Sequence, residues 1–365
     1  MKQIFLIFIS LITAILLCEI FLRTIAPFSS KLQYFTGKKY NVTNDGFDNI
    51  EKLVSSINCS PPSGSLVNGF YTNSKGFMNK EMNYDNPNKN YRIVALGDSF
   101  GVSSAPYKYN YLNILEKSLK KNFQENLELI NLSVVCTGPK IYKDIFLIEG
   151  IKYEPNLVMI GVYVGNDFDD DAVLLIHNPK VKSQKESNQE KLIYKSKLIT
   201  LINSITKYQG FNKNNQIFKK TEKKYGTYDE ESVKNYSPFT PGYSESDYND
   251  LLDAKLTKLF SNSSELYNND AFFKEATNNL EEISKIAKEM NVKVLFVIIP
   301  DEIQVNNEVW EDTINRNNTL AENHDRFLPQ KKLKEFFDLH NERYIDLLPE
   351  LQHFEDPSIL YQPRD

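Results

Sequence analysis

Hydrophobic and polar positions along the chain form short apolar runs separated by amphipathic stretches. Four runs with polar flanks are typical of strands buried in a parallel sheet: Arg92–Leu96, Leu127–Leu132, Leu157–Val164 and Val292–Ile299. A fifth run, Arg343–Leu348, is less apolar, and we expect it at an edge of the sheet.

The stretches between these runs repeat their apolar residues with the period of a helix. Three of them are predicted to be helices: Tyr109–Asn122, Phe272–Met290 and Leu333–His340. Strands that alternate with helices indicate βαβ units. We therefore expect an α/β fold, a three-layer α/β/α sandwich around a mostly parallel sheet.

The amino terminus carries a different pattern, because every residue from Ile4 to Cys18 is apolar except Ser10 and Thr13. With the apolar residues that follow, the run would extend roughly 28 Å as a helix, close to the thickness of about 30 Å of a hydrocarbon core. No small-residue cleavage site follows it. Residues 1–23 are therefore expected to be an uncleaved transmembrane signal-anchor.

The orientation of this anchor is not settled by its flanking charges, because Lys2 lies before it and Arg23 after it. A very short amino-terminal tail favours a cytoplasmic amino terminus. We expect the rest of the chain to be extracytoplasmic, that is, periplasmic or at the cell surface.

Composition then divides the rest of the chain. Residues 24–89 are rich in Asn, Ser, Gly and Lys and predict an irregular lead-in, and residues 90–175 and 272–365 form the α/β domain. Residues 176–271 are a Lys- and Asn-rich helical insertion with one amphipathic segment, Leu192–Lys207. Such a segment fits a membrane-surface helix or a helix packed on the domain, and we favour the second because helix stripes usually cover a core.

Overall composition excludes several classes of protein. Hydrophobic residues make up 41% and charged residues 25%, which rules out wholesale disorder. The formal net charge of −5 argues against nucleic-acid binding. The three cysteines show no CxxC spacing, which argues against a zinc site. In an oxidising compartment Cys59 and Cys136 would form a disulfide, or they would be two unpaired small hydrophobic residues.

Candidate chemistry begins at the first strand, which leads into Gly97-Asp98-Ser99. In an open α/β sheet the ligand crevice lies at the carboxyl ends of the strands. A serine on the turn that leaves such a strand points its hydroxyl into this crevice, and Gly97 permits the tight turn. The tripeptide alone is a weak signal, because ordinary strand-to-helix turns contain it by chance.

Two further strand ends strengthen the hypothesis. The third strand ends in Gly165-Asn166-Asp167, where the Asn166 amide would donate to a developing oxyanion. The second strand leads into a glycine-containing loop, 133–139, which would bring a backbone N–H to the same oxygen. The candidate oxyanion donors are thus Ser99, a residue of this loop, and Asn166.

These three motifs resemble those of the SGNH (GDSL-type) hydrolase superfamily, over about residues 90–365, and most closely its membrane-anchored bacterial members associated with cell-surface polysaccharide. The resemblance implies Ser99 as nucleophile and Asn166 as oxyanion donor. The loop glycine of the family often lies five residues after an Asn that ends the second strand. Counted from Asn131, that position is Cys136 rather than Gly138, so both residues are candidate donors.

The final motif of the family is an Asp followed two or three residues later by the catalytic His. The tail ends at Asp365, which corresponds to this Asp, and no His follows it. None of the four histidines, His177, His324, His340 and His353, substitutes for it by position. We expect an incomplete chain in which Asp365 would orient the missing His.

No cofactor is expected. The acidic run Asp167, Asp169, Asp170 and Asp171 suits a hard cation chemically, but its spacing matches no calcium loop, so we expect no metal.

The function expected for the complete protein is a serine esterase or O-acyl hydrolase. Its substrate would be an ester group, such as O-acetyl, of an acylated carbohydrate, and the reaction would pass through an acyl-serine intermediate. Three alternatives stay open: an O-acyltransferase of the same fold, a non-catalytic module that binds glycan or a partner, and a lipid-active esterase.

Overall fold

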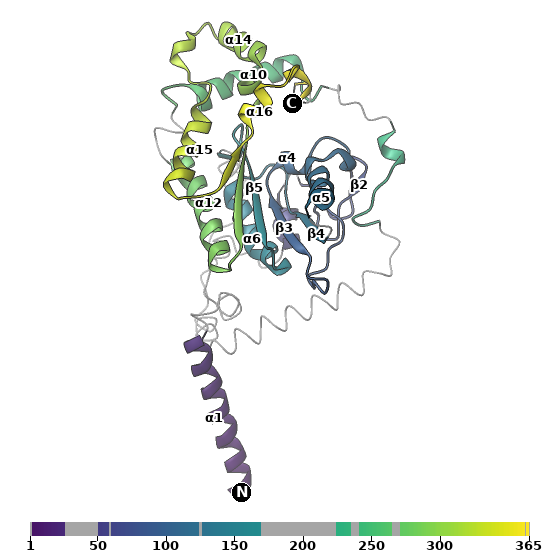
Figure 1. Ribbon diagram of the computed structural model, residues 1–365, viewed down its shortest axis with the longest axis vertical. Coiled ribbons are helices and arrows are strands. Elements are labelled where there is room, and N and C mark those ends of the chain that lie inside the picture. The colour runs from purple at the N-terminus through teal and green to yellow at the C-terminus, as the bar shows by residue number, and fades with distance from the viewer. Residues whose placement is uncertain are drawn as a thin grey trace. The chain divides into compact units, whose positions relative to one another are not determined.

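The structure is a computed structural model that describes residues 2–25, 50–57, 60–123, 126–168, 224–234, 241–264, 271–361 and 363–364 (Figure 1). The chain divides into two compact units, residues 1–46, 181–223 and 289–291 in one and the remaining residues in the other. The first unit contains the helix α1 (Lys2–Ile25). Among the described residues, no helix meets the length and hydropathy needed to cross a membrane.

The second unit is built on a five-stranded sheet with the order β4-β3-β5-β6-β7, in which every neighbouring pair is parallel. The strands are β3 (Tyr91–Leu96), β4 (Leu127–Asn131), β5 (Leu157–Tyr163), β6 (Lys293–Ile299) and β7 (Tyr344–Asp346). The five predicted strands are therefore confirmed to within two residues at each end, and β7 is the expected edge strand.

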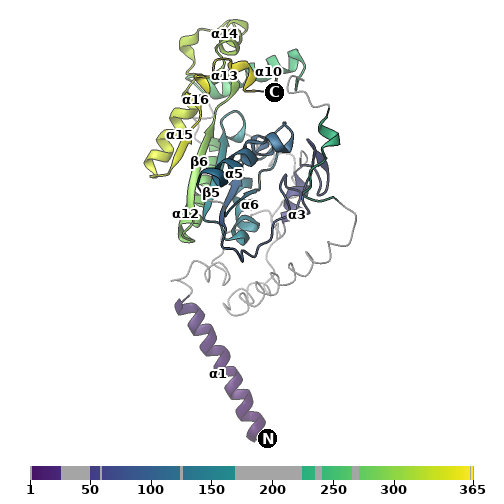
Figure 2. The same ribbon diagram turned by 45° about the vertical axis from the view of Figure 1, so that its right-hand side comes forward.

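Helices pack on both faces of this sheet (Figures 1 and 2). On one face, α5 (Tyr111–Asn122) places Leu112 against Ile93 and Leu129 of the sheet. On the other face, α15 (Leu328–Leu339) stacks Phe337 on Phe296 of β6, with ring centroids 4.5 Å apart. An α/β fold with a parallel sheet is thus confirmed.

Two more helices complete the layers. The expected helix at 272–290 is present as α12 (Ala271–Glu289). The helix α6 (Pro139–Ile148), which follows the loop after β4, packs against β3 and lies beside α12, because Lys143 donates a hydrogen bond to Asn279. Short helices continue the chain between β6 and α15 and after β7: α13 (Glu302–Val305), α14 (Asn307–Arg316) and α16 (Leu348–Gln352).

The predicted lead-in has some regular structure in its described part. It contains α3 (Ile50–Ser56) and a small antiparallel pair, β1 (Leu66–Val67) and β2 (Phe70–Tyr71). Its Lys75 forms a buried ion pair of 2.8 Å with Glu149, which follows α6. Because a buried carboxylate requires a partner, this pair fixes the lead-in to the sheet domain.

The predicted insertion is described only in part, and its amphipathic segment Leu192–Lys207 lies outside the described residues. Its later part forms α10 (Glu245–Lys255), which continues into one π-helical turn, η6 (Leu256–Phe260). Leu252, Leu256 and Phe260 are buried, so this part of the insertion packs on the domain through a helical stripe.

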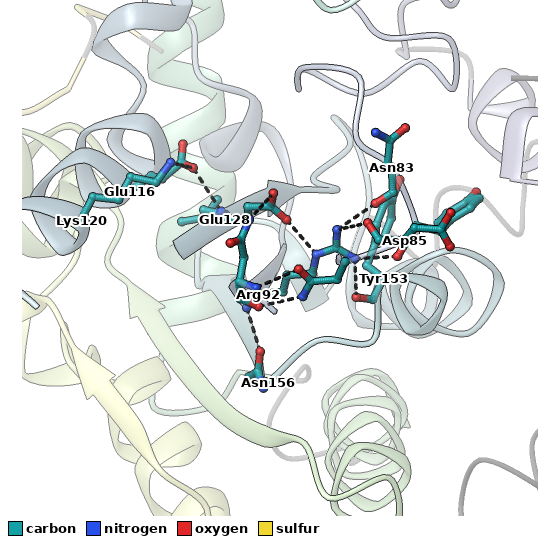
Figure 3. A network of polar contacts seen from close by, with 12 residues as sticks. Asn83, Asp85, Arg92, Glu116, Lys120, Glu128, Tyr153 and Asn156 are labelled. Atoms are coloured by element: carbon teal, nitrogen blue, oxygen red, sulfur yellow. Dashed lines mark hydrogen bonds and ion pairs between the residues drawn. The ribbon is translucent and has the colours of Figure 1, made fainter. Parts of the chain in front are cut away.

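The amino end of β3 is fixed by Arg92, whose side chain is only 2% exposed (Figure 3). Its guanidinium donates to the Glu128 carboxylate and to four backbone carbonyl groups, those of Asn83, Tyr84, Asp85 and Tyr153. The planar fork of arginine thus ties the lead-in, the turn before β5 and the neighbouring strand β4 together.

Replacing Arg92 with Lys should destabilise the fold, because an ammonium group has three donors and cannot reach these five acceptors. Each buried carbonyl left without a donor costs free energy, and we expect a loss of about 3 kcal/mol in the free energy of unfolding. Urea unfolding followed by circular dichroism measures it. Arg343→Lys, at an exposed position, is the matched control, and an equal midpoint for both variants would contradict this role of Arg92.

Candidate active site

Ser99 lies at the point where β3 passes into the short helix α4 (Ser99–Val102). Asp98 caps this helix, because its Oδ1 accepts a hydrogen bond of 3.0 Å from the Phe100 N–H. Asp98 is almost fully buried, whereas Ser99 is exposed. The turn therefore buries the Asp98 carboxyl group and leaves Ser99 exposed at the carboxyl end of β3.

The Ser99 hydroxyl is held by the residue before it, since its Oγ donates to Asp98 Oδ2 over 3.2 Å. Burial raises the pKa of Asp98 to about 6, although the hydrogen bonds from Phe100 and Ser99 favour the ionised form. Near neutral pH the Asp98 carboxylate is thus mostly ionised, and it accepts the hydrogen bond from the Ser99 hydroxyl.

Close packing against the loop after β4 fixes α4. A Cβ at Gly101 would lie 2.5 Å from Ser133 Cβ and closer still to its Oγ, so only glycine fits. Asn131, the last residue of β4, donates from Nδ2 to the Gly101 carbonyl over 2.9 Å, and Asn110 donates to the same oxygen over 2.8 Å. Val134 N–H donates to Gly97 O over 3.0 Å and joins the two strand ends directly.

Both candidate loop donors lie in this segment. Cys136 has a left-handed backbone, with φ of 56°, and is disulfide-bonded. Gly138 precedes α6, is buried, and its N–H makes no hydrogen bond within the described part of the chain. Both residues therefore stay candidate donors to a ligand oxygen. Cys59, the other cysteine of the proposed disulfide, lies outside the described residues.

Asn166 lies on the turn after β5. The buried Oδ1 atom of its side-chain amide has no hydrogen-bond partner, and no hydrogen bond of this side chain is found among the described residues. The following residue, Asp167, is fully buried and accepts the Tyr163 N–H over 3.0 Å, which stabilises the turn. The turn that carries the amide is therefore fixed, and the Nδ2 group of Asn166 makes no hydrogen bond among the described residues.

The sheet brings these three segments to one edge. Leu96 of β3 pairs with Ile160 of β5, and Ala95 pairs with Asn131 of β4, so the residues that follow the three strands emerge together. The ring of Phe100 packs on that of Tyr163 at 4.2 Å between centroids, which places α4 against the end of β5. Ser99, the Gly138 loop and Asn166 thus share the carboxyl edge, as the sequence predicts.

The remaining predicted residues are not brought to this edge by the described structure. Asp365 and His177 lie outside the described residues. Within the described segments, the other three histidines each bond to the backbone of their own helix or turn, and none contacts Ser99: His324, His340 and His353. A histidine base for Ser99 is therefore not found among the described residues.

The acidic run holds only one described residue, Asp167, and Asp169, Asp170 and Asp171 lie outside the described part. No group of three metal-ligating side chains is found in the segments that the structure describes.

A buried ion pair beside the site was not predicted from the sequence. Lys255 Nζ lies 2.6 Å from Asp301 Oδ2, and the Tyr163 hydroxyl donates to the same oxygen over 2.6 Å. Burial alone would raise the pKa of Asp301, but the Lys255 ammonium and the Tyr163 hydroxyl hold it below its ordinary value. The available signal was Pro300-Asp301 directly after β6, because polar residues at that position face the same edge.

The raised pKa of Asp98 predicts a pH-dependent stability. Its folded pKa of about 6 exceeds the ordinary value of 3.8, so the carboxyl group disfavours folding increasingly as the pH rises from about 4 to 6 and its burial becomes the burial of a charge. Asp98→Asn keeps an oxygen to cap α4 but cannot ionise. The free energy of unfolding of the variant relative to the parent should therefore increase by about 2 kcal/mol between pH 4 and pH 7.

Chemical denaturation at several pH values measures this difference. Exposed Asp312→Asn is the control. A difference that is flat with pH would show that Asp98 titrates near its ordinary value.

No protein-family profile matches the chain, and no curated protein matches it in sequence. Among solved structures, the chain is similar to a GDSL-like lipase from Bacteroides thetaiotaomicron, with 8% identity and a TM-score of 0.27 over 73% of this chain and 72% of the other. It is also similar to LAE5, an alpha/beta hydrolase enzyme from the metagenome of Lake Arreo, with 11% identity and a TM-score of 0.28 over 72% and 82%. At these identities and TM-scores the two likenesses carry no argument about function.

Proposed function

We propose that the protein is a serine-dependent enzyme of SGNH type that hydrolyses ester groups on carbohydrate. The observation that carries this proposal is the exposed Ser99 hydroxyl, hydrogen-bonded to a buried carboxylate at the same sheet edge as the unpartnered Asn166 amide. Acyl transfer requires a nucleophile and a hydrogen-bond donor at one site, and the Nδ2 group of Asn166 is a donor at the edge that carries Ser99.

The reaction follows from this placement. Ser99 Oγ attacks the ester carbonyl carbon, its proton passes to a base, and the carbonyl oxygen becomes an oxyanion. We assign the Asn166 amide and a backbone N–H of the loop, that of Cys136 or Gly138, as the donors to that oxygen. Collapse of the tetrahedral species then releases the alcohol. Water then attacks the acyl-serine and releases the acid. Asp365 and a His base oriented by it are the residues that the resemblance assigns to the proton transfer.

We also propose that the enzyme works outside the cytoplasm. The disulfide at Cys136 supports this location, because disulfides persist in oxidising compartments. Membrane attachment through the amino-terminal residues rests on the apolar run of the sequence alone. Ester groups of cell-surface glycans are substrates that such a location would make accessible.

Labelling with a fluorophosphonate probe tests Ser99 as the nucleophile in the full-length protein. We expect one phosphonate on the peptide that contains Ser99, because the probe traps a serine that can attack a tetrahedral centre. Ser99→Ala should abolish this adduct, and Ser104→Ala, an exposed serine just after α4, should keep it. An adduct that survives Ser99→Ala would mean that another serine reacts.

A membrane-impermeant form of the probe extends the same test to location. Labelling of Ser99 in intact cells supports an extracytoplasmic site, whereas labelling only after lysis would place the site inside. A full-length protein that folds but is not labelled would favour a non-catalytic module that binds glycan or a partner.

Asn166→Ala should reduce the rate of p-nitrophenyl acetate hydrolysis by about 100-fold, the usual cost of one oxyanion donor. The melting temperature should change little, because the amide makes no hydrogen bond within the described structure. Steady-state kinetics and thermal unfolding measure the two effects, with exposed Asn278→Ala as the control. A large loss of stability with an unchanged rate would show that Asn166 is structural and not a donor.

A further inference from the structure

The ion pair between Lys255 and Asp301 lies at the carboxyl ends of β5 and β6. Its side chains are 11% and 0% exposed, so both charges are removed from water. Lys255 donates to Asp301 Oδ2 over 2.6 Å, and the Tyr163 hydroxyl donates to the same atom. Asp301 Oδ1 accepts the Ile303 N–H over 3.0 Å and caps α13. The carboxylate is thus held on both oxygens.

This cluster lies directly against the turn that carries Asn166. A Cβ at Gly165 would lie 2.5 Å from Asp301 Oδ2 and would overlap the ring of Tyr163. The N–H of Val164, one residue earlier, donates to Ile299 O over 3.1 Å. A movement of the Asp301 carboxylate would therefore move the backbone just before Asn166.

The same cluster also reaches the turn that carries Ser99. The ring of Tyr163 packs on that of Phe100 with centroids 4.2 Å apart, and Phe100 is the second residue of α4. A displacement of Tyr163 would therefore affect the supports of Ser99 and Asn166 together.

Lys255 belongs to α10, whose other end contacts the tail of the chain. Just before α10, the N–H groups of Gly242 and Tyr243 donate to Pro363 O and Arg364 O over 2.9 and 2.8 Å. The Tyr361 hydroxyl donates to Pro300 O over 2.8 Å. The helix α10 thus connects the tail, near the proposed Asp365, with the ends of β5 and β6.

We propose that Lys255 is a positioning residue that holds Asp301 and Tyr163 against Gly165 and thereby directs the Asn166 amide toward the oxyanion. The inference rests on the proposed acyl transfer. Removing Lys255 leaves a buried carboxylate without its counter-ion, and such a group takes up a proton or moves toward water. Either change removes the fixed contact of Asp301 and Tyr163 with Gly165, so the turn that carries Asn166 becomes more mobile.

The test uses Lys255→Met in the full-length protein with two measurements. Hydrogen–deuterium exchange of the peptide that contains Val164–Phe168 should become about tenfold faster, and fluorophosphonate labelling of Ser99 should become about tenfold slower, as expected for a misplaced donor. Lys255→Arg should restore both values, because it keeps the charge. Lys331→Met is the matched control, since Lys331 forms a surface ion pair of the same 2.6 Å with Asp325.

Asp301→Asn is the second variant. It keeps the cap of α13 but removes the charge, and it should reproduce both effects if Lys255→Met fails to fold. Unchanged exchange and labelling in the Lys255 or Asp301 variant would overturn the inference, as would faster exchange that is equal in the turn and in α6. If the parent protein is not labelled at all, the proposed function fails, and the exchange measurement still decides whether Lys255 holds the turn.

Discussion

The in-register parallel pairing of β3 with β4 and β5 is the constraint on which the site depends. Ala95 lies opposite Asn131, and Leu96 lies opposite Ile160, so β4 ends one residue before β3, and β5 continues three residues beyond it. If the pairing of β4 with β3 shifted by one residue, the Asn131 side chain would turn to the other face of the sheet, away from the Gly101 carbonyl. The position of the Ser99 turn is therefore decided by the apolar registration of the sheet.

Buried polar groups at the two ends of the sheet differ in whether they have hydrogen-bond partners. At the amino end, Arg92 and Glu149 are fully engaged by carbonyl, carboxylate, hydroxyl and ammonium partners, and this end stabilises the fold. At the carboxyl end, Asp98 is buried at a raised pKa, and the Asn166 amide has a buried oxygen without a partner. Native proteins rarely leave buried polar groups unsatisfied, and groups with strongly perturbed pKa values gather at functional sites.

Much of the fold could be predicted from the sequence, because buried parallel strands are continuous apolar runs and α5 and α12 have clear stripes. The helix α6 was not predicted, although its polar residues Lys140, Lys143 and Asp144 recur at the spacing of one helix face. The helix α15 begins at Leu328, before the expected Leu333, because Pro329 fits the first helical turn, where its missing N–H costs nothing.

The strand ends that carry the site residues were predictable for the same reason as the strands. The residues that hold these strand ends in place were not predictable. Lys255 and Asp301 are 46 residues apart in the sequence. Lys255 lies in a segment with many charged residues, so its pairing with Asp301 could not be recognised from the sequence.

The burial of the Asp98 carboxyl group is unfavourable for the stability of the fold, but it serves the site. A four-residue helix such as α4 is too short to be stable by its own hydrogen bonds, so its start depends on the Asp98 cap and on the packing of Gly101 against Ser133. The packing that closes this turn also removes the Asp98 carboxyl from water and raises its pKa. An asparagine would cap the helix without that cost, but it would lack the ionised oxygen that accepts the Ser99 hydroxyl proton in its hydrogen bond. The buried acid is therefore explained by the serine that it holds and not by the stability of the turn.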